Sequence, residues 1–243
     1  MIPKEHPRYR SLVVRERLAE FAREGVLSLE GLTAHGRGEA FDYLLGESTS
    51  ESARLAERTA AAMLLLARKP VISVNGNTAA LAADQIAPLQ QASGALVEVN
   101  LFHRTEERIE KITRLLEANG VSVLSGSRER LLPLPHGRAW CLRDGIFSAD
   151  LVLVPLEDGD RCAALRQMGK DVVTVDLNPL SRTARNATLT VVDELTRALP
   201  EITRSCPEIG KEEALKLVAD LDNDYFLRAA MDVMKERLAH ALD

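Results

Sequence analysis

The chain has 243 residues, of which 46% are apolar and 28% are charged, and this composition excludes an intrinsically disordered protein. Its net charge of −5 leaves no general basic field, so we expect no nucleic-acid partner. The longest apolar run covers positions 60–67, far short of the roughly 20 residues that cross a bilayer. Cys141, Cys162 and Cys206 lack the spacing of a disulfide framework or a zinc site. We therefore expect a cytoplasmic protein with no membrane partner.

Residues 1–69 form the first predicted unit, an N-terminal helical segment that packs on the main domain. Apolar residues recur at helical spacing from about Arg8 to Arg23, and Ser50 precedes a second helix over about 51–68. Between the two lies the stretch HGRGEAFDYLLGE (35–47), which we interpret as a charged, glycine-rich loop anchored by a short helical FDYLL segment. The N-terminal segment is therefore expected to hold one ligand-binding loop.

The start of this loop suits a ligand. Gly36 and Gly38 would let the backbone approach it closely, and Arg37 could clamp a phosphate or a carboxylate with two hydrogen bonds. His35 has two interpretations, a structural hydrogen-bond donor or a catalytic base, and a lone histidine is more often structural.

Residues 70–200 form the second predicted unit, a Rossmann-like α/β core, and residues 201–243 add C-terminal helices. Short β-branched runs alternate with helical periodicity, which is typical of a parallel sheet with right-handed crossovers. The expected strands cover 71–75, 95–100, 121–124, 149–156, 171–177 and 187–193, and the helices between them cover 78–91, 105–119 and 161–168. An irregular excursion over 126–146 holds one short strand near 138–142, and the C-terminal helices break near 207–210 before a final helix over about 225–242.

Polar residues gather where four of these strands end. The strand ends read NGN (75–77), EVNLFHR (98–104), PLEDGDR (155–161) and DLNPLSRT (176–183). In an open parallel sheet, ligands bind in the crevice outside the carboxyl ends of the strands, so the four segments predict one site.

Two of the strand ends have alternative interpretations. The acids of EDGDR could bind Mg²⁺ through oxygen ligands, or Asp158 or Asp160 could cap a helix, and the cap is slightly favoured. DLNPLSRT mixes acceptors with an arginine and suits a nucleotide, but it could equally be a solvent-exposed turn. No G-x-G-x-x-G sequence follows a strand, which counts against NAD.

Taken together, the segments HPRYRSLVVRE, GLTAHGRGEAFDYLLGE, PVISVNGNTAAL, GALVEVNLFHRTEERI, ADLVLVPLEDGDR and DLNPLSRTA resemble the archaeal phosphopantothenate synthetase family, the 4-phosphopantoate:β-alanine ligases. The resemblance runs in order from about Pro3 to Pro200. It implies an ATP-dependent ligase of coenzyme A biosynthesis with a Rossmann-like fold, which is typically a homodimer and releases AMP and diphosphate.

The resemblance also implies which residues contact ATP. These are Arg15, Arg37, Asp176, Leu177, Asn178, Arg182, Thr183, Asp193 and Glu194. Where family members often have asparagine after the aspartate of VVD, this chain has Glu194, so a backbone contact is the safer expectation at that position.

The chemistry of such a ligase adds further candidates. Transfer of AMP to a carboxylate concentrates negative charge at the α-phosphate, which requires arginines and Mg²⁺. Asn75, Gly76, Asn77 and Arg104 are our candidates for the phosphate of 4-phosphopantoate. β-Alanine must lose an ammonium proton before it attacks, and His35, Glu39 and Asp158 are alternative bases. The Mg²⁺ ligands are not predicted.

Two other functions compete with the ligase. A Rossmann-type transferase or dehydrogenase is disfavoured by the missing glycine fingerprint, and a non-catalytic nucleotide sensor by the number of polar strand ends.

Overall fold

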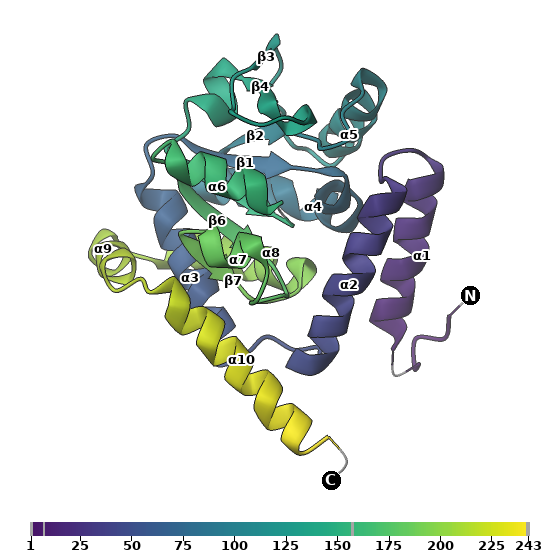
Figure 1. Cartoon of the computed structure of the whole chain (residues 1–243), viewed down its shortest axis with the longest axis vertical. Coiled ribbons are helices and arrows are strands. Elements are labelled where there is room, and N and C mark those ends of the chain that lie inside the picture. The colour runs from purple at the N-terminus through teal and green to yellow at the C-terminus, as the bar shows by residue number, and fades with distance from the viewer. Residues whose placement is uncertain (1, 7, 157, 242–243) are drawn as a thin grey trace.

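A five-stranded parallel sheet forms the centre of the computed structural model, which describes residues 2–6, 8–156 and 158–241 (Figure 1). The strands lie in the order β2 (Leu96–Val99), β1 (Pro70–Val74), β5 (Leu151–Pro155), β6 (Asp171–Val175) and β7 (Leu189–Val191). The predicted Rossmann-like class is therefore confirmed. None of the helices in the described part of the chain is long and apolar enough to span a membrane.

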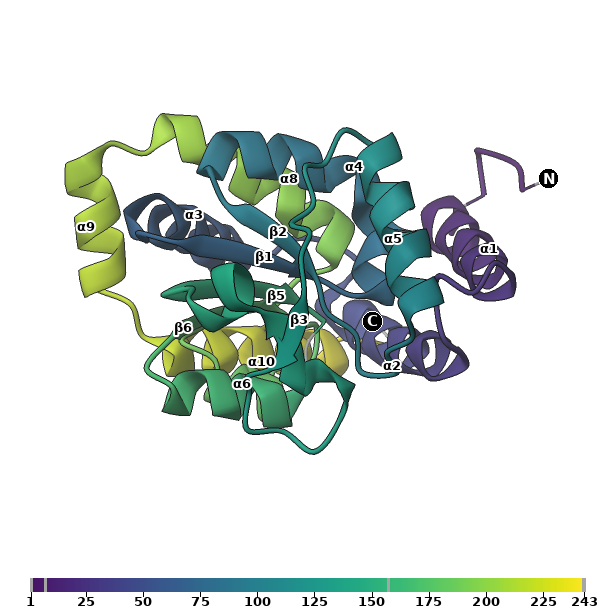
Figure 2. The same ribbon diagram turned by 90° about the horizontal axis from the view of Figure 1, so that it is seen from above.

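Helices cover both faces of this sheet (Figure 2). One face holds α3 (Glu51–Leu66), α4 (Gly76–Ser93) and α8 (Leu195–Ser205), and the other holds α6 (Gly159–Gln167). Successive strand residues point to opposite faces, so Ile72 joins the first core and Val71 the second. Burial on both faces explains why the strands are continuously apolar rather than alternating.

The remaining helices lie at the periphery. At the N-terminus, α1 (Tyr9–Arg23) and α2 (Leu29–Leu45) form a hairpin, and α5 (Glu106–Ala118) and α7 (Arg182–Asn186) follow β2 and β6. After α8, a 3₁₀ turn (Cys206–Glu208), α9 (Lys211–Ala219) and α10 (Asn223–Ala239) complete the chain. The predicted break near 207–210 is confirmed, whereas α7 was not predicted because it has only five residues.

The predicted glycine-rich loop at 35–39 is wrong, because these residues lie inside α2. The Ser28 side chain accepts a hydrogen bond from the Gly31 amide at the start of α2, and Gly46 ends it in the left-handed region with a φ of 88°. These two end signals and packing against α1 and α10 outweigh the low helix propensity of Gly36 and Gly38.

The excursion between β2 and β5 also differs from the prediction. The strand expected over 121–124 is reduced to a single parallel bridge between Val97 and Val123. The short strand near 138–142 is confirmed as β4 (Trp140–Leu142), which pairs antiparallel with β3 (Arg128–Arg130). A 3₁₀ turn (Gly137–Ala139) and a π turn (Arg143–Phe147) flank β4.

The strand order fixes where a ligand can bind. From β1 the chain crosses to β2 on one side, and from β5 it crosses to β6 on the other, so the connections diverge between β1 and β5. At such a switch point, a crevice opens at the carboxyl ends of the strands.

Candidate active site

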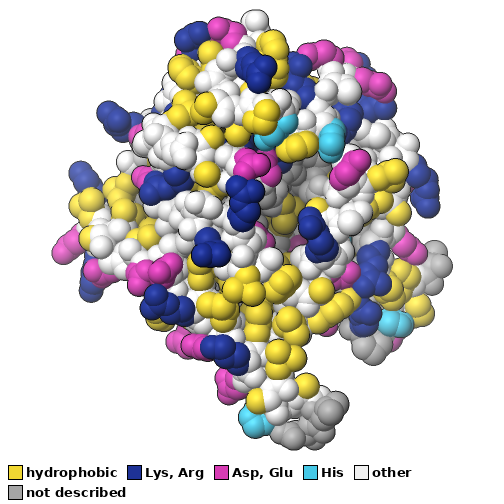
Figure 3. Space-filling view, viewed as in Figure 1, with side chains coloured by type: hydrophobic (Ala, Val, Ile, Leu, Met, Phe, Trp, Pro, Cys, Tyr) yellow, Lys and Arg dark blue, Asp and Glu magenta, His cyan; other side chains and the backbone are white. Residues whose placement is uncertain are grey.

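A cavity of about 550 Å³ lies at this switch point. We call it the switch-point cavity; its walls come from α2, the segments that follow β1, β2 and β5, and the start of α7. The arginines on its wall are Arg37, Arg108, Arg138 and Arg182. Figure 3 shows this face of the molecule hollowed, with Lys and Arg side chains on both sides of the hollow.

The amino ends of α4, α6 and α7 converge on the same cavity. Asn75, Asp158 and Ser181 cap these helices through their side chains, and the residues that follow the caps line the wall. Free backbone amides and the helix dipoles make a helix N-terminus favourable for an anion. Together with the arginines they give the cavity the character of a phosphate site.

Two glycines make this convergence possible. A Cβ atom at Gly76 would lie 2.7 Å from the Val26 carbonyl oxygen, and one at Gly159 would lie 2.6 Å from Cβ of Arg182. Leu156, between β5 and α6, has a φ of 56°, which is unfavourable for a leucine. Strain of this kind persists where the surrounding structure determines the backbone, commonly at functional sites.

The four residues predicted to bind the substrate phosphate separate into two groups. Asn75, Gly76 and Asn77 line the cavity, but the Asn75 amide donates to the carbonyls of Pro155 and Leu156 at 3.1 and 3.0 Å, which ties β1 to β5. Asn77 donates to the Gly31 carbonyl at 2.8 Å and so holds α2. Arg104 pairs with Glu106 and lies over the Trp140 ring, outside the lining of the cavity.

Of the acids of EDGDR, Asp158 caps α6, and both Asp158 and Asp160 form ion pairs. Asp158 accepts a hydrogen bond from the Arg161 amide at 2.9 Å and pairs with Arg138 at 2.8 Å, and Asp160 pairs with Arg182. The third acid, Glu157, lies outside the described residues. No group of three or more metal-ligating side chains occurs within the part of the chain that is described. The cap interpretation is thus confirmed for Asp158.

The DLNPLSRT segment forms a closed turn beside α2. Asp176 accepts hydrogen bonds from the Asn178 amide at 2.9 Å and from Ser181, and the Asn178 side chain accepts one from the Leu180 amide. Burial raises the pKa of the Asp176 carboxyl. A Cβ atom at Gly38 would lie 3.8 Å from the Leu177 side chain, an ordinary van der Waals spacing, so an alanine would fit at this position.

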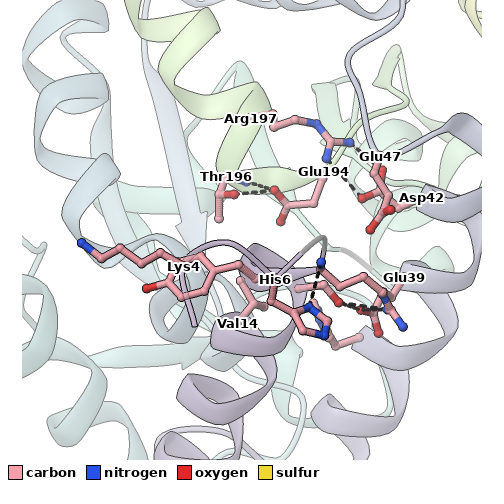
Figure 4. Close-up of a pocket in the computed structure, with 13 residues that line it drawn as sticks. Lys4, His6, Val14, Glu39, Asp42, Glu47, Glu194, Thr196 and Arg197 are labelled. Atoms are coloured by element: carbon pink, nitrogen blue, oxygen red, sulfur yellow. Dashed lines mark hydrogen bonds and ion pairs between the residues drawn. The ribbon is translucent and has the colours of Figure 1, made fainter. Parts of the chain in front are cut away.

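A second cavity, of about 380 Å³, lies on an adjacent face of α2 (Figure 4). We call it the acidic cavity, because four carboxylates line it against two histidines, one lysine and two arginines. The carboxylates are Glu39, Asp42, Glu47 and Glu194, and the other side chains are His6, His35, Lys4, Arg8 and Arg197. Residues 31, 34 and 37 of α2 face the switch-point cavity, whereas residues 35, 39 and 42 face the acidic one. The predicted catalytic residues of α2 are therefore divided between two cavities.

His35 and Glu39 sit in different electrostatic environments. Burial lowers the pKa of His35, so its imidazole is uncharged at neutral pH. Burial opposes the charge of Glu39, but hydrogen bonds from Ser11 and Arg15 outweigh it and lower the pKa of that carboxyl. Arg15 pairs with Glu39 at 3.0 Å and donates to the Tyr43 hydroxyl, which commits its guanidinium to the contact between α1 and α2.

An ion-pair network joins the acidic cavity to the end of β7. Arg197 donates to Asp42 on α2 and to Asp193 after β7, and Thr49 donates to the other oxygen of Asp193 at 2.6 Å. Burial opposes the charge of Arg197, but Asp42 and Asp193 raise the pKa of its guanidinium. Figure 4 shows the Arg197 side chain extended toward Asp42. Asp193 is 1% exposed and is therefore an internal anchor.

Glu194 caps the next helix. Its carboxylate accepts hydrogen bonds from the amide of Thr196 at 2.8 Å and from the hydroxyl of the same residue. Burial raises the pKa of the Glu194 carboxyl. The side chain is therefore directed to the start of α8 while the residue still lines the acidic cavity.

Sequence reasoning missed several residues at these cavities. Arg108 donates to the Val26 carbonyl at 3.1 Å, and Arg138 and Arg197 pair with acids from distant segments. No local motif marks the long-range contacts of Arg108 and Arg197, because Val26 and Asp42 are about 80 and 155 residues away in the chain. Arg138 lies in PHGR (135–138), a proline- and glycine-bounded basic segment that could have been singled out.

Comparison with known proteins gives one consistent family. A family model described as phosphopantothenate/pantothenate synthetase matches residues 52–237. A protein of Methanospirillum hungatei is 58% identical over 243 residues, which cover 100% of both chains. Relatives from Methanosarcina mazei and Thermococcus kodakarensis are 51% and 49% identical and cover 98% of this chain and 95% and 93% of their own. All three relatives are named 4-phosphopantoate–β-alanine ligase.

Proposed function

Because the chain belongs to the phosphopantothenate/pantothenate synthetase family, we propose that it is a ligase that condenses 4-phosphopantoate with β-alanine to 4′-phosphopantothenate. The product is an intermediate on the way to coenzyme A. The observation that carries the proposal is 58% identity along the whole of a relative with that name. The arginine-lined cavity at the switch point supports it, because one substrate carries a phosphate and the other reactant a triphosphate.

ATP is the energy source in this proposal. It transfers AMP to the carboxylate of 4-phosphopantoate and releases diphosphate, and the amine then attacks the acyl-adenylate and displaces AMP. Arg37, Arg182 and Thr183 line the switch-point cavity and are our candidates for the triphosphate. They would act by stabilising the charge that develops at the α-phosphate.

The adenosine part is assigned to the region between the two cavities. The turn at Asp176, Leu177 and Asn178 and the segment at Asp193 and Glu194 follow neighbouring strands β6 and β7. The side-chain oxygens of Asp176, Asp193 and Glu194 already accept hydrogen bonds from other protein groups, so we expect backbone groups to contribute much of the recognition. Arg15, which is held by Glu39, would act at its edge.

Mg²⁺ fits this site only if the triphosphate of ATP supplies most of its oxygen ligands. The described residues hold no cluster of three ligands, and Mg²⁺ at such sites commonly binds phosphate oxygens and water with one or two carboxylates. When bound, it neutralises phosphate charge. His35 and Glu39 at the acidic cavity and Asp158 at the switch-point cavity are our alternative candidates for the base that deprotonates β-alanine.

A homodimer and a cytoplasmic location complete the proposal. Partly buried apolar side chains on α2 and α10, Phe41, Leu44 and Val233, lie over the small core between these helices. Figure 3 shows apolar side chains gathered on this part of the surface, and a contiguous apolar patch is typical of an interface. The three cysteines are buried and free, which suits a reducing compartment.

One assay tests the activity. The protein is incubated with ATP, Mg²⁺, 4-phosphopantoate and β-alanine, and nucleotides and diphosphate are measured. AMP and diphosphate that require both co-substrates are expected. ADP would instead indicate an acyl-phosphate intermediate, and no nucleotide turnover would contradict the ligase.

A further inference from the structure

Phe102 is an exposed aromatic residue on the wall of the switch-point cavity, in the segment that follows β2. It is 42% exposed, whereas the two leucines of the same wall, Leu101 and Leu156, are buried and half-buried. Most other residues of the wall carry charged or amide side chains. Among the described lining residues, Phe102 is therefore the largest exposed apolar side chain that a ligand can meet.

Three contacts hold the Phe102 ring in place. One face of the ring stacks on His136, with centroids 4.3 Å apart and an interplanar angle of 25°, and His103 meets it edge-on at 4.9 Å. A Cβ atom on Gly137 would lie 2.5 Å from the Phe102 carbonyl oxygen, so the backbone of this segment packs directly against the 3₁₀ turn. Because the ring is held before a ligand arrives, binding costs little side-chain entropy.

Arg108 places a positive charge beside this segment. Its guanidinium donates to the His103 carbonyl at 2.5 Å and to the Val26 carbonyl at 3.1 Å. A Cβ atom at Gly76 would lie 3.1 Å from the same guanidinium, which therefore borders the start of α4. These two bonds leave other N–H donors of the guanidinium for an anion. A cationic group and an apolar ring thus share one short stretch of the cavity wall.

4-Phosphopantoate carries groups in the same arrangement. Its phosphate ester and its two methyl groups are attached to adjacent carbon atoms. A site that holds the phosphate therefore removes the methyl groups from water only if an apolar surface lies directly beside the anion-binding group. Phe102 next to Arg108 provides such a surface.

We propose that the Phe102 ring packs on the two methyl groups of 4-phosphopantoate while Arg108 binds its phosphate, an inference that rests on the ligase function proposed above. Phe102 is then a specificity-determining residue, because it favours this acid over one that lacks the methyl groups. The substrate carboxylate, at the other end of the acid, is directed away from Arg108 toward the middle of the cavity.

Strand order separates this contact from the adenosine part of ATP. An exposed aromatic ring can also stack on a nucleotide base. Phe102, however, follows β2 at one edge of the sheet, whereas adenosine is assigned to the segments after β6 and β7 at the other edge. Because β1 and β5 lie between β2 and β6, the two places are about three strand spacings apart, roughly 14 Å. The triphosphate and the substrate carboxylate can meet between them.

A substrate analogue tests the contact in the full-length chain. The analogue is the dihydroxybutyrate phosphate that lacks both methyl groups, and kcat/KM for AMP formation with β-alanine is measured with each acid. The wild type should favour 4-phosphopantoate by about 10-fold or more, and Phe102→Ala should reduce this preference by about 5-fold. If the analogue turns over too slowly, its inhibition constant against 4-phosphopantoate replaces kcat/KM.

The kinetic parameters should divide in a definite way. In Phe102→Ala the loss should appear in KM for 4-phosphopantoate, while kcat and the KM for ATP change by less than about twofold, because a contact remote from the reacting carboxylate is the same in the ground and transition states. Arg108→Gln should weaken both acids alike, since the analogue keeps its phosphate. An Arg108→Gln variant with wild-type KM for both acids would overturn the phosphate contact.

Two further variants serve as controls. Phe102→Leu keeps an apolar side chain and should retain most of the preference. Trp140→Ala removes an aromatic residue of similar exposure that lies beneath Arg104 and outside the described lining, and it should leave the preference at its wild-type value.

Three results would overturn the role of Phe102: a wild type without preference between the acids, an unchanged preference in Phe102→Ala, or a larger rise in KM for ATP than for the acid. Failure of the wild type to form AMP from ATP, 4-phosphopantoate and β-alanine would instead overturn the proposed function, so the two failures are distinguishable.

Discussion

Arg37 is exposed on α2 and makes no hydrogen bond or ion pair with any other described residue, yet it lines the switch-point cavity. A free guanidinium at the mouth of an anion site is available for a ligand, whereas Arg15 and Arg197 are occupied by acids. Arg37 is therefore the first arginine to replace in a test of ATP binding.

Arg37→Ala should lower kcat/KM for ATP by about 10- to 100-fold, which corresponds to one charged hydrogen bond. The fold should be unaffected, because alanine favours the helix and no described partner is lost. Steady-state kinetics and a urea melt give the two readouts. Arg114→Ala, which removes an exposed pair with Glu110 on α5, is the matched control, and equal kinetics in both variants would remove Arg37 from the site.

Glu57 on α3 is a fully buried acid beside Asp193. Burial, followed by the negative charge of Asp193, raises the pKa of Glu57 to about 9. Neither of its oxygens has a hydrogen-bond partner among the described residues, so no donor there stabilises a charged carboxylate. The folded state therefore binds this proton more tightly than the unfolded chain.

Because Glu57 binds its proton more tightly in the folded state, its contribution to the free energy of unfolding falls as the pH rises. The contribution of Glu57 is fully present below the ordinary pKa of 4.5 and is lost as the pH rises to about 9. Glu57→Gln, which stays neutral and can donate to Asp193, should raise the free energy of unfolding at pH 8 by about 1 to 3 kcal/mol. Urea melts at pH 5 and pH 8 check this, and an equal effect at both values would contradict a protonated Glu57.

At the scale of elements, α2 controls the geometry of both cavities, because residues on two of its faces line them. Two contacts hold it: the hydrogen bond from Asn77 to the Gly31 carbonyl and the ion pair of Asp42 with Arg197. A small displacement of α2 would therefore change both cavities together.

Two glycines of α2 allow a matched test. A Cβ atom at Gly31 would lie 2.5 Å from Oδ1 of Asn77, whereas one at Gly36 would meet nothing within 4 Å. Gly31→Ala should destabilise the protein by about 1 to 3 kcal/mol and lower activity, since the side chains of Asn77 and Leu27 must move and Asn77 holds the Gly31 carbonyl. Gly36→Ala should stabilise it by about 0.5 to 1 kcal/mol. Thermal melts compare the two, and the same sign for both would show that α2 packs differently.

The Asp42–Arg197 pair ties α2 to α8 and can be tested by removing one partner. Arg197→Met leaves Asp42 and Asp193 without their shared cation, and loss of one member of a buried pair costs about 2 to 4 kcal/mol. Urea melts measure the loss. Arg204→Ala, whose exposed pairs lie within or beside the same helix, should change stability by less than about 0.5 kcal/mol. Similar losses in the two variants would argue against a buried tie.

At the scale of the whole molecule, the apolar side chains between α2 and α10 predict a dimer. The double variant Leu44→Lys and Val233→Lys places two charges on this surface and should sediment as a monomer, while the wild type sediments as a dimer. Analytical ultracentrifugation provides the measurement. A wild type that is monomeric at micromolar concentration would contradict the proposed interface.

Local sequence signals account for most of the secondary structure. The strands ending at Val74 and Pro155 are apolar and rich in β-branched residues, and Ser50 and Gly94 supply end signals for helices α3 and α4. The error at 35–39 arose because glycine is a weak helix former, and its effect was outweighed by packing against α1 and α10 that no local pattern contains. The prediction of a strand at 121–124 was wrong, because only a single bridge, between Val123 and Val97, forms there.

The sequence by itself determined the fold class, the polar strand ends and the family resemblance, because strand periodicity, helix caps and motif composition are local properties of the chain. Only the tertiary structure decided that α2 separates two cavities, that Asp158 and Arg15 are held by partners, and that neither carboxyl oxygen of Glu57 has a hydrogen-bond partner among the described residues. The physical reason is that burial, ion pairing and unsatisfied hydrogen bonds depend on which distant segments meet. Here Asp42 meets Arg197 across 155 positions, and nothing near either residue in the sequence indicates the contact.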